Sequence, residues 1–276
     1  MARRNSIDVR PVAGALGAEI HGIDLATDLD DDTFGLIHDA LLEHGAIMFR
    51  DQDITPQQQL DFAARWGEIH LHPHMPCLDG HPGIFEIVKN PDDTTVIGGQ
   101  WHTDQMFTPT PARVTMLYAK EIPAAGGDTL FANLYDAYDT LSDGMKDILG
   151  ELRTVSLYDK KKKRPGVMTP TDIDTPAEPV VHPLIRPHTE TGRRALYMSY
   201  DGITRRIDGM TDEESKPILA YLQDHITRPE NTCRFRWEPG SLGIWDNRCV
   251  QHLAVNDYNG HRRVMHRVTV VGERTS

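Results

Sequence analysis

Apolar residues recur every three to four positions in two parts of the N-terminal quarter of the chain. The segment "DDTFGLIHDALLEHG" (residues 31–45) has acidic residues in its first turn and Gly45 after its last apolar position, which predicts an amphipathic helix. In "TPQQQLDFAARWGE" (residues 55–68), Thr55 occupies an N-cap position and Pro56 the first helical position, so we expect a second helix. Between the two, "AIMFRDQ" predicts a short buried strand.

From Gly83 onward, short β-like runs alternate with Gly and Pro, and two helical segments, residues 133–152 and 211–226, interrupt them. The predicted strands are "GIFEIV", "ARVTMLYAKEI", "DTLFAN", "CRFRW", "SLGIWD" and "HRVTVVG". Many short strands with helices set aside are typical of an antiparallel sandwich or a jelly roll with peripheral helices. Because neither an internal repeat nor a linker is visible, we expect a single domain over residues 1–276.

A Lys- and Pro-rich segment between residues 158 and 181 lacks any periodicity. Two interpretations stay open: a solvated surface loop, or a lid that closes on a substrate.

The charge and cysteine content of the chain restrict its partners and its compartment. Its 276 residues carry a formal net charge of −12, which argues against nucleic acid as a partner. The sequence has no run of eighteen apolar residues and no apolar signal segment at its start, so we expect no membrane insertion and no secretory signal. Its three cysteines form no CxxC pair, which favours neither a disulfide framework nor a zinc knuckle. We therefore expect a cytoplasmic protein.

The tetrapeptide "WHTD" places a histidine and an aspartate two positions apart. On a strand or at its end, residues i and i+2 point to the same face, so His102 and Asp104 would share one site. An imidazole nitrogen and a carboxylate oxygen together suit a divalent metal ion. A His-x-Asp pair is also common in ordinary polar turns, so the rest of the chain must supply further ligands before a metal site is inferred.

His252, which follows the strand-like run "GIWD", is a candidate for the third ligand. Two histidines and one carboxylate are the ligand set of non-haem Fe(II) oxygenases, which leave coordination positions open for other molecules. A zinc hydrolase would use similar ligands but needs a general base beside the metal-bound water, and the chain has no HExxH motif.

The run "HRRVMHRVTVVG" near the C-terminus separates charged from apolar side chains. With the period of a strand, Arg263 and Arg267 fall on one face and the valines on the other. If the arginine face is buried, each guanidinium needs an anion, which could be a bound carboxylate or an internal Asp or Glu. At about 3.3 Å per residue the two arginines lie roughly 13 Å apart, so they would hold different anions.

Several segments together make the chain resemble the taurine dioxygenase family of Fe(II)/2-oxoglutarate-dependent oxygenases, which includes the aryloxyalkanoate dioxygenases. The segments are "GAEIHGIDL", "FRDQDITPQQQ", "WHTDQMF", "GGDTLF", "HPLIRPHTETGRRALY", "WDNRCVQH" and "RRVMHRVTVVG". The resemblance implies a distorted double-stranded β-helix, which is a jelly roll, with peripheral helices. It also implies an Fe(II)- and 2-oxoglutarate-dependent dioxygenase that uses O2, hydroxylates a small anionic organic substrate and releases succinate and CO2.

The resemblance also assigns roles to the metal and co-substrate residues. It implies that Thr129 and Arg263 hold the distal carboxylate of 2-oxoglutarate. Arg267 would contact either the near carboxylate of 2-oxoglutarate or the anionic head of the substrate. The implied Fe(II) ligands are His102, Asp104 and His252.

The implied substrate pocket departs from the taurine pattern in its composition. His72 matches a residue that binds the sulfonate of taurine, and Phe107 matches an aromatic wall. Gly98, however, replaces an Asn, Met75 replaces a Tyr, and Gln105 stands where a small aliphatic residue is usual. We therefore expect a small anion but leave its class open between a sulfonate, a sulfate ester and an aryloxy or alkyl carboxylate.

Other interpretations of the same residues stay open. The chain could be a non-catalytic jelly-roll protein that binds a metal or an organic acid, or a metallohydrolase on the same scaffold. The histidine cluster "HLHPH" (residues 70–74) could form the polar rim of an active site or a second metal site. A homo-oligomer, either a dimer or a tetramer, is the expected assembly.

Overall fold

Eight strands form the larger sheet of the structure, a computed structural model that describes residues 7–71, 77–158 and 178–275. Neighbouring strands are antiparallel except for the parallel pair of β2 and β3. In spatial order the strands are β1 (Asp8–Pro11), β2 (Ala18–His21), β3 (Ala46–Phe49), β14 (Leu242–Asp246), β6 (Val114–Glu121), β16 (Arg263–Val270), β5 (His81–Lys89) and β4 (Cys77–Leu78).

A smaller sheet faces the larger one, and the principal core lies between them. Leu117 and Met265 of the larger sheet belong to the same buried cluster as Phe131 and Phe235 of the smaller one. The strands of the smaller sheet are, in spatial order, β13 (Thr232–Phe235), β7 (Thr129–Asn133) and β15 (Val250–Ala254). A third sheet consists of β12 (Thr204–Ile207), β8 (Arg153–Ser156) and β9 (Val180–Pro183). A fourth sheet pairs β10 (Ile185–Pro187) with β11 (Arg194–Leu196). The prediction of a mainly β jelly roll is confirmed.

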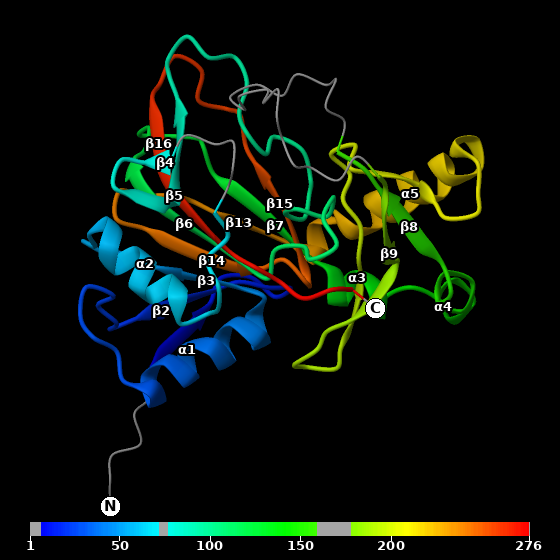
Figure 1. Cartoon of the computed structure of the whole chain (residues 1–276), viewed down its shortest axis with the longest axis horizontal. Coiled ribbons are helices and arrows are strands. Elements are labelled where there is room, and N and C mark those ends of the chain that lie inside the picture. Colours follow the sequence, from blue (N-terminus) through cyan, green and yellow to red (C-terminus); the bar gives the residue numbers. More distant parts are fainter. Residues whose placement is uncertain (1–6, 72–76, 159–177, 276) are drawn as a thin grey trace, which may run out of the picture.

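Helices cover the outside of this sandwich (Figure 1). Ile37 of α1 (Asp31–His44) and Phe62 of α2 (Pro56–Ala64) pack in a second core cluster with Phe49 and Val268, on the outer face of the larger sheet. The remaining helical elements, of which α4 and α5 lie on the right of Figure 1, are α3 (Leu134–Asp139), α4 (Asp143–Leu149), α5 (Asp212–Ile226) and the 3-10 helix η1 (Pro229–Asn231).

Both helices predicted in the N-terminal quarter begin at the predicted residues, Asp31 and Pro56. Thr55 caps α2 through its side chain, and Gln58 completes a capping box; Gly45 ends α1 at φ 69°, a backbone angle that favours glycine. The predicted helical segment 133–152 differs, because it forms two helices rather than one. Ser142 accepts a hydrogen bond from the Met145 amide and starts α4, which separates it from α3.

The side chains of β16 alternate between the two cores as the sequence predicts. Met265 lies in the core between the sheets, whereas Val268 and Val270 lie in the core beneath α1 and α2. Arg263 and Arg267 share the parity of Met265, so both arginines belong to the inner face. This is the arrangement that lets a strand present cations to the interior of the sandwich.

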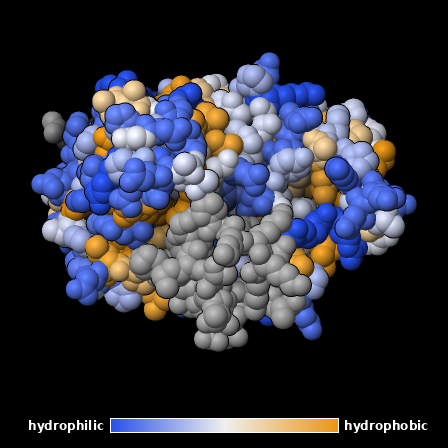
Figure 2. Space-filling model, turned by 90° about the horizontal axis from the view of Figure 1, so that it is seen from above, coloured by the Kyte–Doolittle hydropathy of each residue, from blue (hydrophilic) through white to orange (hydrophobic). Residues whose placement is uncertain are grey.

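The outer surface carries no obvious apolar docking face in the part of the chain that is described. Its exposed large apolar residues are spread over distant elements, namely Val12, Leu71, Ile148, Tyr200 and Tyr221. Figure 2 shows a mostly hydrophilic face with small separate apolar patches. No helix among the described residues is long and apolar enough to cross a membrane. Most of the Lys-rich segment, residues 159–177, lies outside the described residues, so its role as a loop or a lid stays a prediction.

Candidate active site

His102, Asp104 and His252 converge on one point inside the sandwich. One ligand atom from each lies within 4.8 Å of the others, and among the described residues this is the only such group of three or more His, Cys, Asp and Glu residues. The distance is 3.6 Å from His102 Nε2 to Asp104 Oδ1 and 3.8 Å from His252 Nε2 to Asp104 Oδ2. The set of two imidazoles and one carboxylate fits Fe(II) and leaves other coordination positions to exogenous molecules.

Backbone pairing brings the two histidines together although 150 residues separate them. His102 and His252 exchange both backbone hydrogen bonds, at 3.0 and 2.8 Å, in a single β-bridge beside β15. His102 Nδ1 donates to the carbonyl of Gln100 at 2.7 Å, so Nε2 carries the lone pair that can bind a metal. Burial, followed by the nearby His102, lowers the pKa of His252 well below its usual value. A neutral imidazole of this kind is the form that ligates metals.

Asp104 is a buried carboxylate that remains ionised. Burial alone raises its pKa, but the charge of Arg267 and then the two histidines and Thr115 outweigh this effect and hold the pKa of Asp104 below its ordinary value. The Arg267 Nη2 atom lies 2.6 Å from Asp104 Oδ2, and its guanidinium lies 5.2 Å from the centre of the Phe85 ring. The inner-face arginine nearest the triad is thus part of the same charged cluster.

Arg263 and Thr129 lie in a second polar region of the interior. Arg263 is 5% exposed, and its Nε and Nη2 atoms have no hydrogen-bond partner. The indole of Trp237 lies 6.0 Å from the guanidinium carbon and donates a 2.9 Å hydrogen bond to Thr129 Oγ1. The loop before Thr129 packs on the arginine, because a Cβ built at Gly127 would lie 3.2 Å from Arg263 Cδ. A buried guanidinium with unused donors has the chemistry to bind an anion.

Residues 8–269 match the taurine catabolism dioxygenase TauD, TfdA family. The chain belongs to this family.

Relatives within the TauD, TfdA family extend over almost the entire chain. An alpha-ketoglutarate-dependent sulfate ester dioxygenase of Pseudomonas putida is 37% identical, over 97% of this chain and 90% of its own. An (S)-phenoxypropionate/alpha-ketoglutarate-dioxygenase of Sphingobium herbicidovorans is 28% identical, over 98% and 97%. The crystal structure of a taurine dioxygenase from Burkholderia xenovorans superimposes with a TM-score of 0.84 at 37% identity, covering 98% of this chain and 92% of that one.

Family membership and the triad together confirm the predicted reaction class. The chain is an Fe(II)- and 2-oxoglutarate-dependent dioxygenase with O2 as its other co-substrate. The alternatives of a non-catalytic binding protein and of a metallohydrolase find no support among these relatives.

The predicted substrate residues of this family member differ in their surroundings. Gln105, adjacent to Asp104, has a positive φ of 58°, and its Nε2 atom lies 3.1 Å from His70 Nδ1. Phe107 packs against Tyr158 with ring centroids 5.1 Å apart. His72 and Met75 lie outside the described residues, so the expected anion contact of His72 stays a prediction.

Gly98, which replaces the Asn of the taurine pattern, lies against His102. Its φ is +77°, and a Cβ at this position would lie 3.0 Å from His102 Cε1. The missing side chain therefore allows a close approach between this loop and the imidazole.

Thr115 and Asn247 fix the carboxylate of Asp104, and sequence reasoning missed both. Thr115 Oγ1 donates to Asp104 Oδ2 at 2.7 Å while it accepts from Asn247 Nδ2 at 2.9 Å. The Asn247 oxygen accepts from the Trp245 indole at 3.2 Å. Because an indole N–H only donates, the amide of Asn247 must turn its NH2 group toward Thr115, whose hydroxyl proton is then directed at Asp104. The available sequence signal was the "WDN" run ahead of His252.

Replacing Thr115 by valine should weaken metal binding by about 10–100-fold, the usual effect of losing a residue that orients a metal ligand. Anaerobic titration with Fe(II), or with redox-inert Mn(II), measures the change. Thr154→Val is the matched control, because Thr154 is a buried threonine whose hydroxyl has no hydrogen-bond partner. Equal metal affinity in the two variants would show that the Thr115 hydroxyl does not orient the ligand.

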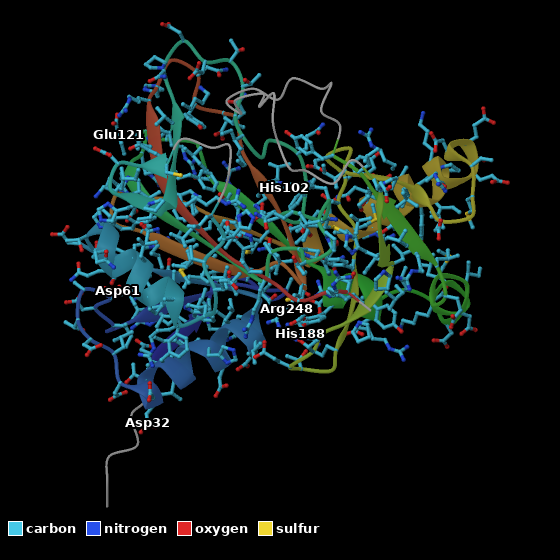
Figure 3. All side chains as sticks on the ribbon, in the orientation of Figure 1. Asp32, Asp61, His102, Glu121, His188 and Arg248 are labelled. Carbon is cyan, nitrogen blue, oxygen red and sulfur yellow. The ribbon has the colours of Figure 1, made fainter. Side chains whose placement is uncertain are left out.

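A second buried charge cluster lies apart from the iron site (Figure 3), where Arg248 and His188 lie close together and below His102. Arg248 Nη2 contacts Asp246 Oδ2 at 2.6 Å, and His188 Nε2 donates to the same oxygen at 3.0 Å. Arg248 Nη1 also contacts Glu190 at 2.7 Å. Asp246 immediately precedes Asn247, so this cluster anchors the turn that orients Asp104.

Proposed function

We propose that His102, Asp104 and His252 hold Fe(II), and that the enzyme hydroxylates a small organic anion next to its charged head. The observation that carries this proposal is the convergence of the three ligand atoms within 4.8 Å beside the guanidinium of Arg267. When bound, the iron supplies the redox chemistry that couples O2-dependent decarboxylation of 2-oxoglutarate to oxidation of a substrate C–H bond. One oxygen atom of O2 enters succinate and the other enters the hydroxylated product, with CO2 released.

The protein's own residues bind and orient the two organic molecules. Arg263, with its unused buried donors, would hold the distal carboxylate of 2-oxoglutarate together with Thr129. This fixes the distance of the co-substrate from the triad, so that binding energy is used for positioning. Arg267 would compensate an anion near Asp104, either on the substrate or at the near end of 2-oxoglutarate.

For the substrate itself we favour a sulfate ester or a sulfonate over an aryloxy carboxylate. The support is that the sulfate ester dioxygenase is 37% identical to this chain and the phenoxypropionate dioxygenase 28%. Gln105, Phe107, Arg267 and, by the family resemblance, His72 would form the pocket. Hydroxylation of the carbon that bears a sulfate would give a hemiacetal-type product that collapses to an aldehyde and inorganic sulfate.

Substrate-dependent succinate release tests this function. Alkyl sulfates, sulfonates and aryloxy acids are offered with Fe(II) and 2-oxoglutarate, with and without O2. We expect succinate and aldehyde in equal amounts with an alkyl sulfate, and none without O2. Sulfate release that continues without O2 would instead indicate hydrolysis. Succinate release that occurs only with aryloxy acids would reverse our choice of substrate.

We also propose that the enzyme is a cytoplasmic homo-oligomer formed by a single domain, with no nucleic-acid partner. Cys233 and Cys249 are buried thiols that take part in no disulfide, which a reducing compartment preserves. The net charge of −12 opposes binding to nucleic acid. Closed symmetric assemblies, dimers above all, are the commonest state of such proteins. Light scattering on the purified chain measures the oligomeric state.

A further inference from the structure

A second buried cation lies directly beside Arg263. Lys89 ends β5 and is the antiparallel partner of Arg263 in the register of β16, which places the two Cβ atoms about 5 Å apart on the same face. Lys89 is 4% exposed and Arg263 5%. Like charges in directly opposed positions destabilise a sheet, and burial strengthens the repulsion.

Neither cation forms an ion pair with a carboxylate among the described residues, although Asp128 is near enough to act on the charge of Arg263. Lys89 Nζ has no hydrogen-bond partner, like Arg263 Nε and Nη2. Of the acidic residues in this region, Asp128 and Asp257 are engaged by Arg234 at 2.6 and 3.1 Å. Asp93, which also lines the pocket, accepts a hydrogen bond from the Asn90 amide at 2.7 Å. Within the described part of the chain, Lys89 Nζ lies 4.5 Å from the centroid of the Tyr258 ring, a cation–π contact that compensates its charge in part. A buried ammonium and a buried guanidinium that form no ion pair together favour the binding of an anion.

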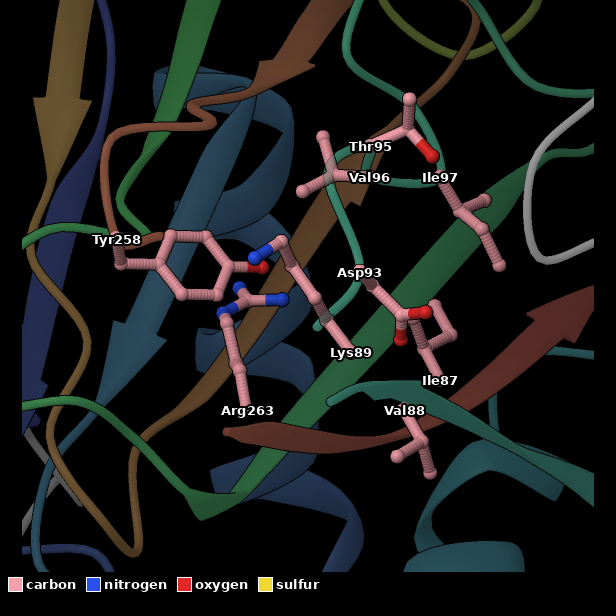
Figure 4. Close-up of a pocket in the computed structure, with 9 residues that line it drawn as sticks. All are labelled: Ile87, Val88, Lys89, Asp93, Thr95, Val96, Ile97, Tyr258 and Arg263. Atoms are coloured by element: carbon pink, nitrogen blue, oxygen red, sulfur yellow. The ribbon is translucent and has the colours of Figure 1, made fainter. Parts of the chain in front are cut away.

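Both side chains line one pocket of about 160 Å³. Figure 4 shows the ends of Lys89 and Arg263 beside the Tyr258 ring, on the same side of the pocket. Thr95, Val96 and neighbouring residues form another part of the lining, immediately before Gly98, whose Cβ position meets the His102 ring. The lining of this pocket therefore continues along the chain into the residue that packs on the iron-site histidine.

We infer that Lys89 is a second cationic contact for the distal carboxylate of 2-oxoglutarate, so that two strands clamp this group with Lys89 and Arg263. The inference rests on the proposed role of Arg263. A carboxylate offers about four lone-pair positions on two oxygens, enough for a guanidinium and an ammonium together. The clamp makes the enzyme selective for 2-oxo acids with a second carboxylate, because a ligand without one leaves two buried cations unpaired.

Ligand binding to the full chain loaded with Mn(II), measured by anaerobic calorimetry, tests the clamp without turnover. We compare 2-oxoglutarate with 2-oxopentanoate, which has the same carbon chain but lacks the distal carboxylate. Lys89→Met should weaken 2-oxoglutarate binding about tenfold or more, as expected for loss of a charge-assisted hydrogen bond. The same variant should bind 2-oxopentanoate as tightly as the unmodified enzyme or more tightly. Lys120→Met, at an exposed lysine of β6, should change neither.

A Lys89→Met variant that folds and binds 2-oxoglutarate with unchanged affinity overturns the inference, and so does equal weakening toward both ligands. Lys89→Gln serves as a second uncharged variant if Lys89→Met does not fold, and Lys89→Arg should restore affinity. Arg263→Met is measured in parallel. If Arg263→Met leaves 2-oxoglutarate affinity unchanged, the proposed anchor itself is wrong; if only Lys89→Met is without effect, the anchor stands and the clamp is wrong.

Discussion

Replacement of His102 by alanine should lower succinate formation by at least about 1,000-fold, on the order of 4 kcal/mol of transition-state stabilisation, while the fold is retained. His102 contributes one of three metal-binding atoms, and its Nε2 lies 3.6 Å from Asp104 Oδ1. The two remaining ligand side chains cannot replace the lost nitrogen, so metal occupancy falls together with activity. Substrate-dependent succinate and Mn(II) affinity are both measured, with circular dichroism as the check on folding.

Asp104→Ala should abolish succinate formation in the same way. It differs from His102→Ala because it also removes the partner of Arg267, whose guanidinium lies 2.6 Å from Asp104 Oδ2. The matched control is His261→Ala, at an exposed histidine outside both charge clusters. Robust turnover in either ligand variant, with the control active, would disprove the assignment of the iron site.

Replacement of Arg248 by methionine should lower the free energy of unfolding by about 3–5 kcal/mol, because it leaves the carboxylate of Asp246 buried without its main partner. Asp246 is 0% exposed and Arg248 2%, and the two are joined by contacts as short as 2.6 Å. For a chain of this size the melting temperature should fall by roughly 10 °C. Denaturant unfolding and calorimetry measure the change.

The double variant Arg248→Met/Asp246→Asn shows whether the loss comes from the unpaired charge. It should be less destabilised than the sum of the single variants, since removing both charges avoids the uncompensated ion. Additive losses would mean that packing, and not charge, explains the Arg248 result.

The stability contributed by Asp246 should depend on pH in one direction. Burial raises the pKa of Asp246, but Arg248 and His188 outweigh this effect and hold it below its ordinary value. The folded state therefore binds fewer protons than the unfolded state at moderately acidic pH, so the contribution is complete above the ordinary aspartate pKa of about 4 and is lost as the pH falls further. Asp246→Asn should flatten this part of the stability curve relative to the unmodified chain.

Local patterns in the sequence were sufficient for the helices and strands that carry their own start and stop signals. Thr55 and Gly45 mark the ends of helices through hydrogen bonds and backbone angles that involve only neighbouring residues. The alternation in β16 likewise assigned the arginines to the inner face, because side-chain direction in a strand has a period of two. The division of residues 133–152 into two helices was missed, since the apolar stripe continues across the cap at Ser142.

The sequence by itself determined the reaction class, since the ligand types, the arginine strand and the family segments are all local features of the chain. Only the tertiary structure decided what surrounds each ligand. Thr115 and Asn247 reach the iron site, and Lys89 comes to lie beside Arg263, through strand pairing over long distances in the chain. Register between strands depends on the packing of whole sheets. For the same reason no local pattern could show that Lys89 stands opposite Arg263 as a buried cation without a hydrogen-bond partner.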